Sequence, residues 1–169
     1  MAALAVPREV EAVFQQVRTC EFTTLAKDGT PITWPTVALY QPGNGRFVIT
    51  TSIGLPHKAF NVRRTPRVAM LYSNPTGSGL AAPPAVLVQG EAVCPDQVVT
   101  QSDELDALGR LVMARQPVST RYSANRLTRW LMDWYMMRLR IYVTPRRIRW
   151  WPHGDVSRPA GELEVDHVA

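Results

Sequence analysis

The chain has little cysteine, little histidine and almost no lysine, and each shortage excludes a class of protein. It has 169 residues, with two cysteines and three histidines. Cys20 and Cys94 have neither the close spacing of a zinc site nor the number that a disulfide framework needs. With the histidines scattered as well, we expect no metal site. Lys27 and Lys58 are the only lysines, so arginine supplies most of the positive charge behind the net charge of +5.

Long hydrophobic runs are also missing. The longest apolar stretches, such as residues 81–88, are far too short to cross a bilayer, and prolines interrupt that one. The first twenty residues carry charges within a helical pattern and lack an apolar core of signal-peptide length. We therefore expect no membrane segment and, by default, a soluble cytoplasmic protein. Apolar residues make up 46% of the chain, enough for one domain of this length to bury a core.

Arginines gather near the end of the chain, where a nucleic-acid surface is one explanation. The residues concerned are Arg138, Arg140, Arg146, Arg147 and Arg149. No zinc finger, helix-turn-helix or RNP-type aromatic motif accompanies them. A solvated strand face explains the pattern better, so we expect no nucleic-acid partner, although a basic nucleic-acid-binding barrel stays as an alternative.

Short β-type segments, tight turns and inserted helices alternate along the chain. We expect helices over residues 5–18, 58–64, 95–117 and 119–137, and strands over 20–26, 31–40, 47–51, 67–72, 85–93, 139–143 and 147–151. An Asp-Gly turn at residues 27–30 is typical of an antiparallel hairpin. Several such strands with helices as inserts predict a closed or partly closed antiparallel barrel with peripheral helices.

Some finer features are expected as well. Asp96 can cap the helix after Pro95, Gly90 marks a bulge, and Thr144 and Pro145 form a turn between the last two strands. We expect a single domain over residues 1–152 with a helical insertion at about 96–137, and a polar, mobile tail at 153–169.

The segment from Arg46 to Tyr72 predicts an anion-binding site. Its strand ends in Thr50, Thr51 and Ser52, and His57 and Lys58 stand at the start of the following helix. Hydroxyl groups, helix N–H groups and positive charge are what a phosphate needs. The alternative is that these are ordinary strand residues followed by a solvated lysine.

Three stretches in this order resemble the FMN-binding split barrel of the pyridoxamine 5′-phosphate oxidase-like proteins. They are Gly29-Thr30-Pro31 leading to Trp34–Leu39, Thr50–Ser52 with His57–Ala59 and Pro66–Val68, and Val143–Trp151 with its Pro, Ile and terminal aromatic pair. The resemblance implies a mainly β fold, an antiparallel, Greek-key-like split β-barrel, that works as a homodimer with the cofactor between the subunits.

The resemblance also assigns site residues. Thr50, Thr51, Ser52, His57 and Lys58 would hold the phosphate of FMN. The proline-broken strand would present an apolar slot with backbone donors to the flavin ring, and Trp151 would close that slot. The slot residues are Trp34, Pro35, Thr36 and Val37.

The chain departs from the oxidases of this family at several positions. Trp34 and His57 stand where those enzymes carry arginines, and Leu39 where they carry a lysine. No Arg-x-His motif follows Trp151, so we expect no true pyridoxamine phosphate oxidase. The paired Arg63 and Arg64 resemble a branch that binds either FMN or a deazaflavin coenzyme, whose polyglutamate tail these residues or the Arg138–Arg149 group would suit.

The expected function is that of a flavin- or deazaflavin-dependent oxidoreductase that transfers hydride to or from an unknown small substrate. No acid–base pair is evident in the sequence, and the catalytic residues stay unknown. Tyr40 or Tyr72 is the only candidate proton donor. The alternative of a different class is a cofactor carrier or sensor without turnover.

Overall fold

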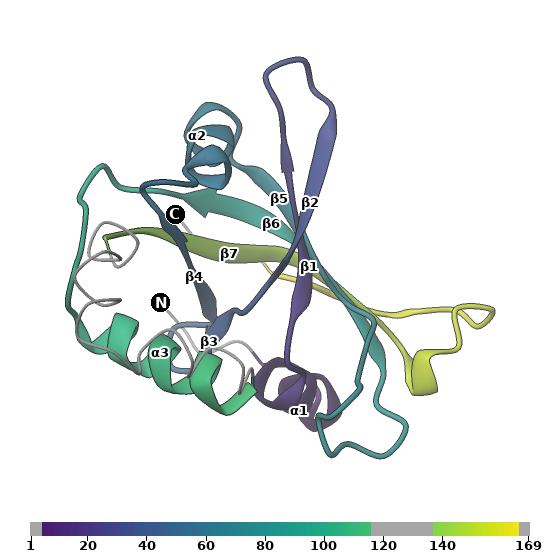
Figure 1. Ribbon diagram of the computed structural model, residues 1–169. Coiled ribbons are helices and arrows are strands. Elements are labelled where there is room, and N and C mark those ends of the chain that lie inside the picture. Colours follow the sequence, from purple (N-terminus) through teal and green to yellow (C-terminus); the bar gives the residue numbers. More distant parts are fainter. Residues whose placement is uncertain (1–4, 116–136, 166–169) are drawn as a thin grey trace.

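The chain folds into a curled antiparallel sheet with helices at its ends (Figure 1). The computed structural model describes residues 5–115 and 137–165. Its elements are α1 (Arg8–Gln16), β1 (Cys20–Leu25), β2 (Pro31–Thr36), β3 (Leu39–Gln41), β4 (Arg46–Ser52), α2 (His57–Arg64), β5 (Arg67–Tyr72), β6 (Ala85–Val93), α3 (Asp103–Arg115), β7 (Arg138–Trp151), the 3-10 turn η2 (Pro152–Gly154) and β8 (Gly161–Glu164). The strand order is β2-β1-β5-β6-β7-β4-β3, with β8 on β7. This is the split β-barrel that the sequence predicts.

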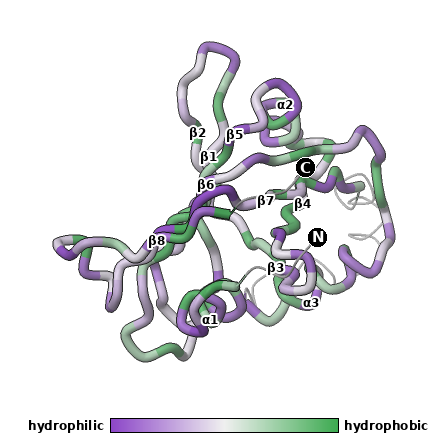
Figure 2. Tube along the Cα trace, turned by 180° about the vertical axis from the view of Figure 1, so that it is seen from behind, coloured by the Kyte–Doolittle hydropathy of each residue, from purple (hydrophilic) through white to green (hydrophobic). Residues whose placement is uncertain are grey.

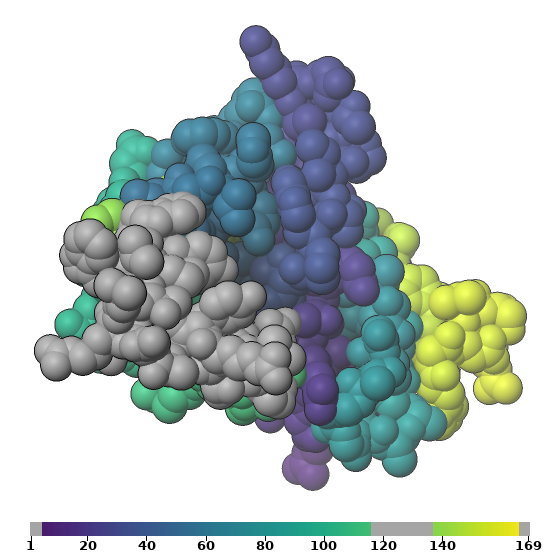
Figure 3. Space-filling view, in the orientation of Figure 1, coloured from purple at the N-terminus to yellow at the C-terminus, as the bar shows by residue number. Residues whose placement is uncertain are grey.

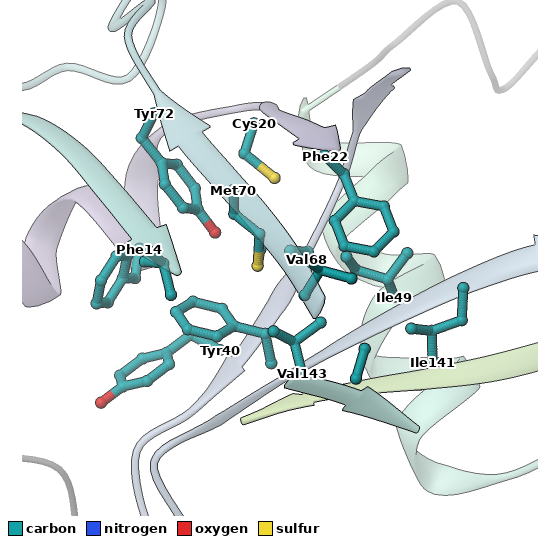
Figure 4. Packing of buried hydrophobic residues seen from close by; sticks show 14 of the residues in the cluster. Phe14, Cys20, Phe22, Tyr40, Ile49, Val68, Met70, Tyr72, Ile141 and Val143 are labelled. Atoms are coloured by element: carbon teal, nitrogen blue, oxygen red, sulfur yellow. The ribbon is translucent and has the colours of Figure 1, made fainter. Parts of the chain in front are cut away.

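The concave face of the sheet holds the core. Alternate residues of each strand point to it, among them Phe22 of β1, Phe47 of β4 and Ile141 of β7, all fully buried. The ring of Phe14, from α1, lies 4.9 Å from that of Phe47, edge to face, so α1 closes one end of the barrel. Figure 4 shows this packing. Burial of each such ring stabilises the fold by about 1.5–3 kcal/mol.

Strand β2 is an edge that its prolines protect. The N–H of Ala26 donates to the carbonyl of Thr30, so even-numbered residues of β2 turn their backbone groups toward β1. Pro31 and Pro35 therefore stand at positions that face outward, where they offer no N–H group. A further strand cannot pair fully along this edge.

Strand β7 corrects one expectation. The turn expected at Thr144 and Pro145 does not form, and β7 runs unbroken from Arg138 to Trp151. A bulge absorbs the proline, because Gly90 pairs with Pro145 while Gln89 pairs with Arg147, which leaves Arg146 as the extra residue. The bulge predicted at Gly90 is confirmed, and a side chain there would collide with the Thr144 carbonyl.

The region after β6 also differs from expectation. Residues 95–102 are not helical, and Val99 instead bridges to Arg138. The helix begins at Asp103, and the hydroxyl of Ser102 accepts the N–H of Leu105 as its cap. Asp96, the expected cap, pairs with Arg63. The helix predicted over residues 119–137 falls on residues 116–136, outside the described part of the chain, except for Met137.

Two further boundaries differ. The strand predicted over residues 31–40 is divided into β2 and β3 by residues 37 and 38. The tail predicted to be mobile contains β8, whose Glu162 and Glu164 pair with arginines of β7. Complementary charges on facing strands order a segment whose polar composition alone predicted a loose end.

No helix in the described ranges has the length and apolar character needed to cross a membrane. Figure 2 shows hydrophobic and hydrophilic stretches interleaved along the coloured part of the trace.

Candidate functional site

Lys58 is the centre of the candidate site. It lies in the first turn of α2, partly buried, with its Nζ atom 5.9 Å from the ring centroid of Trp34 on β2. Residues of α2 and β2 meet on the surface shown in Figure 3. Burial, with a smaller contribution from Arg138, lowers the pKa of the Lys58 ammonium group. No carboxylate pairs with this ammonium among the described residues, which leave it as a desolvated cation with no counterion of their own.

The start of α2 adds to this positive potential. Pro56 stands at the N-cap, and no side chain caps the first turn. Backbone N–H groups at an uncapped helix start carry partial positive charge and accept an anion readily. His57 begins the helix and is exposed. The ammonium group and the helix start together have the chemistry that a phosphate group requires.

The hydroxyl groups predicted to bind phosphate have several orientations. Thr51 donates to the carbonyl of Leu55 at 2.7 Å, and the Oγ atom of Ser52 accepts the N–H of Gly54 at 3.2 Å. These bonds shape the loop that leads into α2. Thr50 projects from the opposite face to Thr51 and lies beside Arg140 in the sheet register. The three hydroxyls therefore do not converge on one point.

Strand β2 forms the other wall of the site. Trp34 and Thr36 lie opposite the buried residues Phe22 and Cys20 and so share the concave face with them. The hydroxyl of Thr36 donates to the carbonyl of Trp34. Pro35 is exposed on the other face, and Val37 follows the strand with its side chain half-buried. Trp34 is thus the residue of this stretch that the structure brings to Lys58.

Trp151 lies far from Lys58 within one chain. Arg138, whose charge acts on Lys58, begins β7, and Trp151 ends it beside Ala85 of β6. The thirteen residue steps between them span about 40 Å of extended strand. Figure 1 shows α2 and the end of β7 at opposite sides of the molecule. One chain alone does not join Trp151 to the Lys58 site.

The two tyrosines considered as proton donors are core residues. Tyr72 is 2% exposed and Tyr40 is 7% exposed, and both pack against Phe14. Burial raises the pKa of Tyr72 well above its usual range and also raises that of Tyr40. Burial likewise raises the pKa of the nearby Cys20 thiol to about 12. None of these groups is set up to exchange protons with a ligand at neutral pH.

The paired arginines of α2 have partners within the chain. Arg63 donates to the carbonyls of Cys94 and Pro95 and pairs with Asp96. Arg64 donates to the carbonyl of Leu25 and to the side chain of Asn61. Both guanidinium groups therefore tie α2 to neighbouring segments.

A cluster of side chains around one carboxylate on the convex face was not predicted from the sequence. Glu104 of α3 binds Arg46, Arg140, Gln41 and Tyr142, which come from three strands. The sequence shows the arginines near residue 140, but nothing in the spacing predicts that they contact residues 41, 46 and 104. Only the sheet order brings these residues together.

A separate cavity of about 170 Å³ lies at the far end of the barrel, lined in part by Tyr72, Pro84 and His153. The Nδ1 atom of His153 lies 3.2 Å from the carbonyl of Ala82, and both residues have positive φ angles. The cavity includes none of the residues predicted to bind the cofactor.

Comparisons with known proteins find similar solved structures but no match by sequence. No family model matches the chain, and no curated protein matches its sequence. A heme-binding protein from Mycobacterium smegmatis is similar in structure, with a TM-score of 0.57 and 18% identity over 95% of this chain. The chain spans 60% of that protein's length.

Two other solved structures match most of both chains. One is a Clostridium acetobutylicum protein related to general stress protein 26, of the pyridoxinephosphate oxidase family, with a TM-score of 0.59 and 10% identity over 93% of this chain and 92% of that one. The other is an F420 reductase, with a TM-score of 0.57 and 21% identity over 85% of this chain and 98% of that one. At these identities the likeness is one of fold. The chain therefore has the split β-barrel fold of the pyridoxamine 5′-phosphate oxidase-like proteins.

Proposed function

We propose that the chain binds FMN, or alternatively a deazaflavin coenzyme, by its phosphate at Lys58 and the start of α2, and acts as a redox protein on a small substrate. The observation that carries this proposal is the desolvated Lys58 ammonium group, which has no carboxylate partner among the described residues and lies beside Trp34. An anion there supplies the missing counter-charge, and an aromatic wall suits a flat ring. The fold it shares with an F420 reductase and a pyridoxinephosphate oxidase family protein supports a flavin-type cofactor.

In this proposal the protein supplies binding and shape. The bound cofactor supplies the hydride chemistry. Lys58 neutralises the phosphate, Ser52 has a hydroxyl hydrogen to donate, and Trp34 limits where the ring can lie. The substrates of a true pyridoxamine phosphate oxidase are not proposed, because Trp34 and His57 replace arginines of those enzymes.

A carrier or sensor without turnover is the second candidate. The burial of Tyr40 and Tyr72 favours it, because these were the only protein proton donors that the sequence suggested. FMN is the first cofactor to test, because Arg63 and Arg64 are engaged within the chain and leave a polyglutamate tail without these partners. The arginines of β7 pair with Glu91, Glu104, Glu162 and Glu164, which supports the proposal that nucleic acid is not a partner.

Titration of the purified protein with FMN and with deazaflavin coenzyme tests the proposal. Lys58→Met removes the charge and keeps the length of the side chain, so affinity should fall by roughly 10- to 100-fold, since a charge-assisted contact contributes about 1.5–3 kcal/mol. Lys27→Met is a matched control, because Lys27 is the other lysine and lies in the exposed β1–β2 turn. No binding of either cofactor at micromolar concentration, or equal loss in both variants, would contradict the proposal.

We further propose that the working unit is a homodimer in which Trp151 of one subunit completes the Lys58 site of the other. The distance between these residues along β7 motivates this arrangement. Lys58→Met and Trp151→Ala subunits should each bind cofactor weakly alone. After exchange into mixed dimers, each dimer should regain one intact site. If Trp151 acts within its own chain, or not at all, mixing will restore no binding.

A further inference from the structure

Glu104 is the meeting point of four hydrogen-bond donors on the convex face of the sheet. Its Oε1 atom accepts from Arg46 at 3.0 Å and from the Gln41 amide at 3.2 Å. Its Oε2 atom accepts from Arg140 at 3.3 Å and from the Tyr142 hydroxyl at 2.8 Å. Both oxygens are therefore saturated, and two of the four donors are cationic. Burial favours the protonated acid, yet these bonds and charges lower the pKa of Glu104 overall.

The donors are held in place by contacts of their own. Arg46 stacks over the ring of Tyr142, with its Cζ atom 4.4 Å from the centroid, and its Nε donates to Gln41 at 2.7 Å. Arg140 is anchored by a bond to Gln97. The strands β3, β4 and β7 are neighbours in the sheet, so their pairing fixes the backbone from which the four side chains project. They are a preorganised site for an oxyanion, and we call them the carboxylate cradle.

The helix that brings Glu104 to the carboxylate cradle buries few of its own side chains among the described residues. Of the thirteen residues of α3, Leu108 and Arg115 are the buried ones. Arg115 donates to the carbonyl of Gln15 at the end of α1. Most of the remaining side chains are exposed or half-buried. An element with so little buried surface opens at low free-energy cost compared with the core.

The carboxylate cradle also has unused donor capacity. The Nε atom of Arg140 is buried and makes no hydrogen bond. A buried donor without a partner is costly, and a bound carboxylate that is free to reposition, unlike the tethered Glu104, can relieve that cost.

We propose that Gln41, Arg46, Arg140 and Tyr142 form a binding site for carboxylate ligands, in which Glu104 is an internal ligand and α3 is a displaceable cover. When Glu104 leaves, a small external carboxylate takes its place between the two arginines. This inference does not rest on the proposed cofactor, because the carboxylate cradle lies on the convex face and Lys58 approaches Trp34 on the concave face.

Chemical rescue tests the proposal. Glu104→Ala removes the internal carboxylate and leaves space for acetate. Titration with sodium acetate should raise the Tm of this variant by about 3 °C and then saturate, whereas sodium chloride at equal ionic strength should not. Wild type should show a smaller acetate-specific rise, because acetate there must displace the tethered carboxylate of Glu104. Asp103→Ala is the matched control, because Asp103 is a neighbouring exposed acid on α3.

A second variant keeps the test decisive. Glu104→Gln fills the same space with a neutral amide, so acetate should have no effect on it. If Glu104→Ala does not fold in chloride, recovery of folded protein in acetate is the same measurement and supports the proposal. Equal responses to acetate and chloride in Glu104→Ala, whether in Tm or in folded yield, would overturn it.

Discussion

Two cationic regions of this barrel differ in whether the chain supplies the counterion. On the convex face, Arg46 and Arg140 share the carboxylate of Glu104, and both pairs lie within 3.3 Å. On the concave side, Lys58 is desolvated by its surroundings and faces an aromatic ring instead of an acid. Within residues 5–115 and 137–165, the first region has a carboxylate counter-charge and the second has none.

This difference separates charge that the chain already pairs with an internal carboxylate from charge that we propose is paired by a bound ligand. Burial of a charge without a counterion destabilises the folded state, which supports the proposal that a bound anion supplies the counter-charge at Lys58. At the carboxylate cradle Glu104 already supplies the counter-charge, so removal of one arginine costs stability whether or not an external carboxylate ever binds. The two regions should therefore respond to charge removal with opposite signs.

Loss of one arginine from the carboxylate cradle should have the largest effect. Arg140→Met should lower the free energy of unfolding by about 2 kcal/mol, because hydrogen bonds to a charged group are broken and Glu104 stays half-buried with fewer donors. Urea unfolding measures this change. Arg149→Met on the same strand is the control, since its more exposed pair with Glu162 should contribute less than about 1 kcal/mol. Equal losses in the two variants would mean that the carboxylate cradle is no tighter than a surface pair.

Much of the fold follows from local patterns in the sequence. Alternation and β-branched residues predict β5 and β6 with the bounds that the structure has, and the Asp-Gly turn predicts the β1–β2 hairpin. The turn predicted at Pro145 was wrong, because proline usually ends a strand but here lies within one. The bulge that admits it depends on Gly90, which lies 55 residues earlier in the chain.

The candidate site likewise has a part that the sequence predicts locally and a part that depends on long-range packing. Lys58 could be placed from the sequence because strand, loop and helix start are contiguous there. Its closeness to Trp34 depends on how α2 docks across β1 and β2, and Trp151 at the far end of β7 could not be placed. The carboxylate cradle had no sequence signal, since Gln41 and Tyr142 meet only through the strand order.

Removal of the Lys58 charge should have a smaller effect on stability, in the opposite direction. In the absence of cofactor, Lys58→Met should raise the free energy of unfolding by about 0.5–1 kcal/mol at neutral pH, because a desolvated ammonium group is replaced by an apolar side chain of similar length. The folded-state pKa of Lys58 lies below its ordinary value of 10.5, so the unfolded chain binds the proton more tightly.

The pH dependence of unfolding tests the sign of this stability change. Below the lowered pKa both states are protonated and the penalty is complete. As pH rises through that pKa, wild type loses the penalty, and its difference from Lys58→Met should close. Urea unfolding of both proteins at about pH 7 and about pH 10 measures this convergence, with Lys27→Met as the control that should stay level with wild type at each pH. If Lys58→Met instead lost as much stability as Arg140→Met, Lys58 would be a structural cation with a partner in the fold, and the contrast between the two regions would disappear.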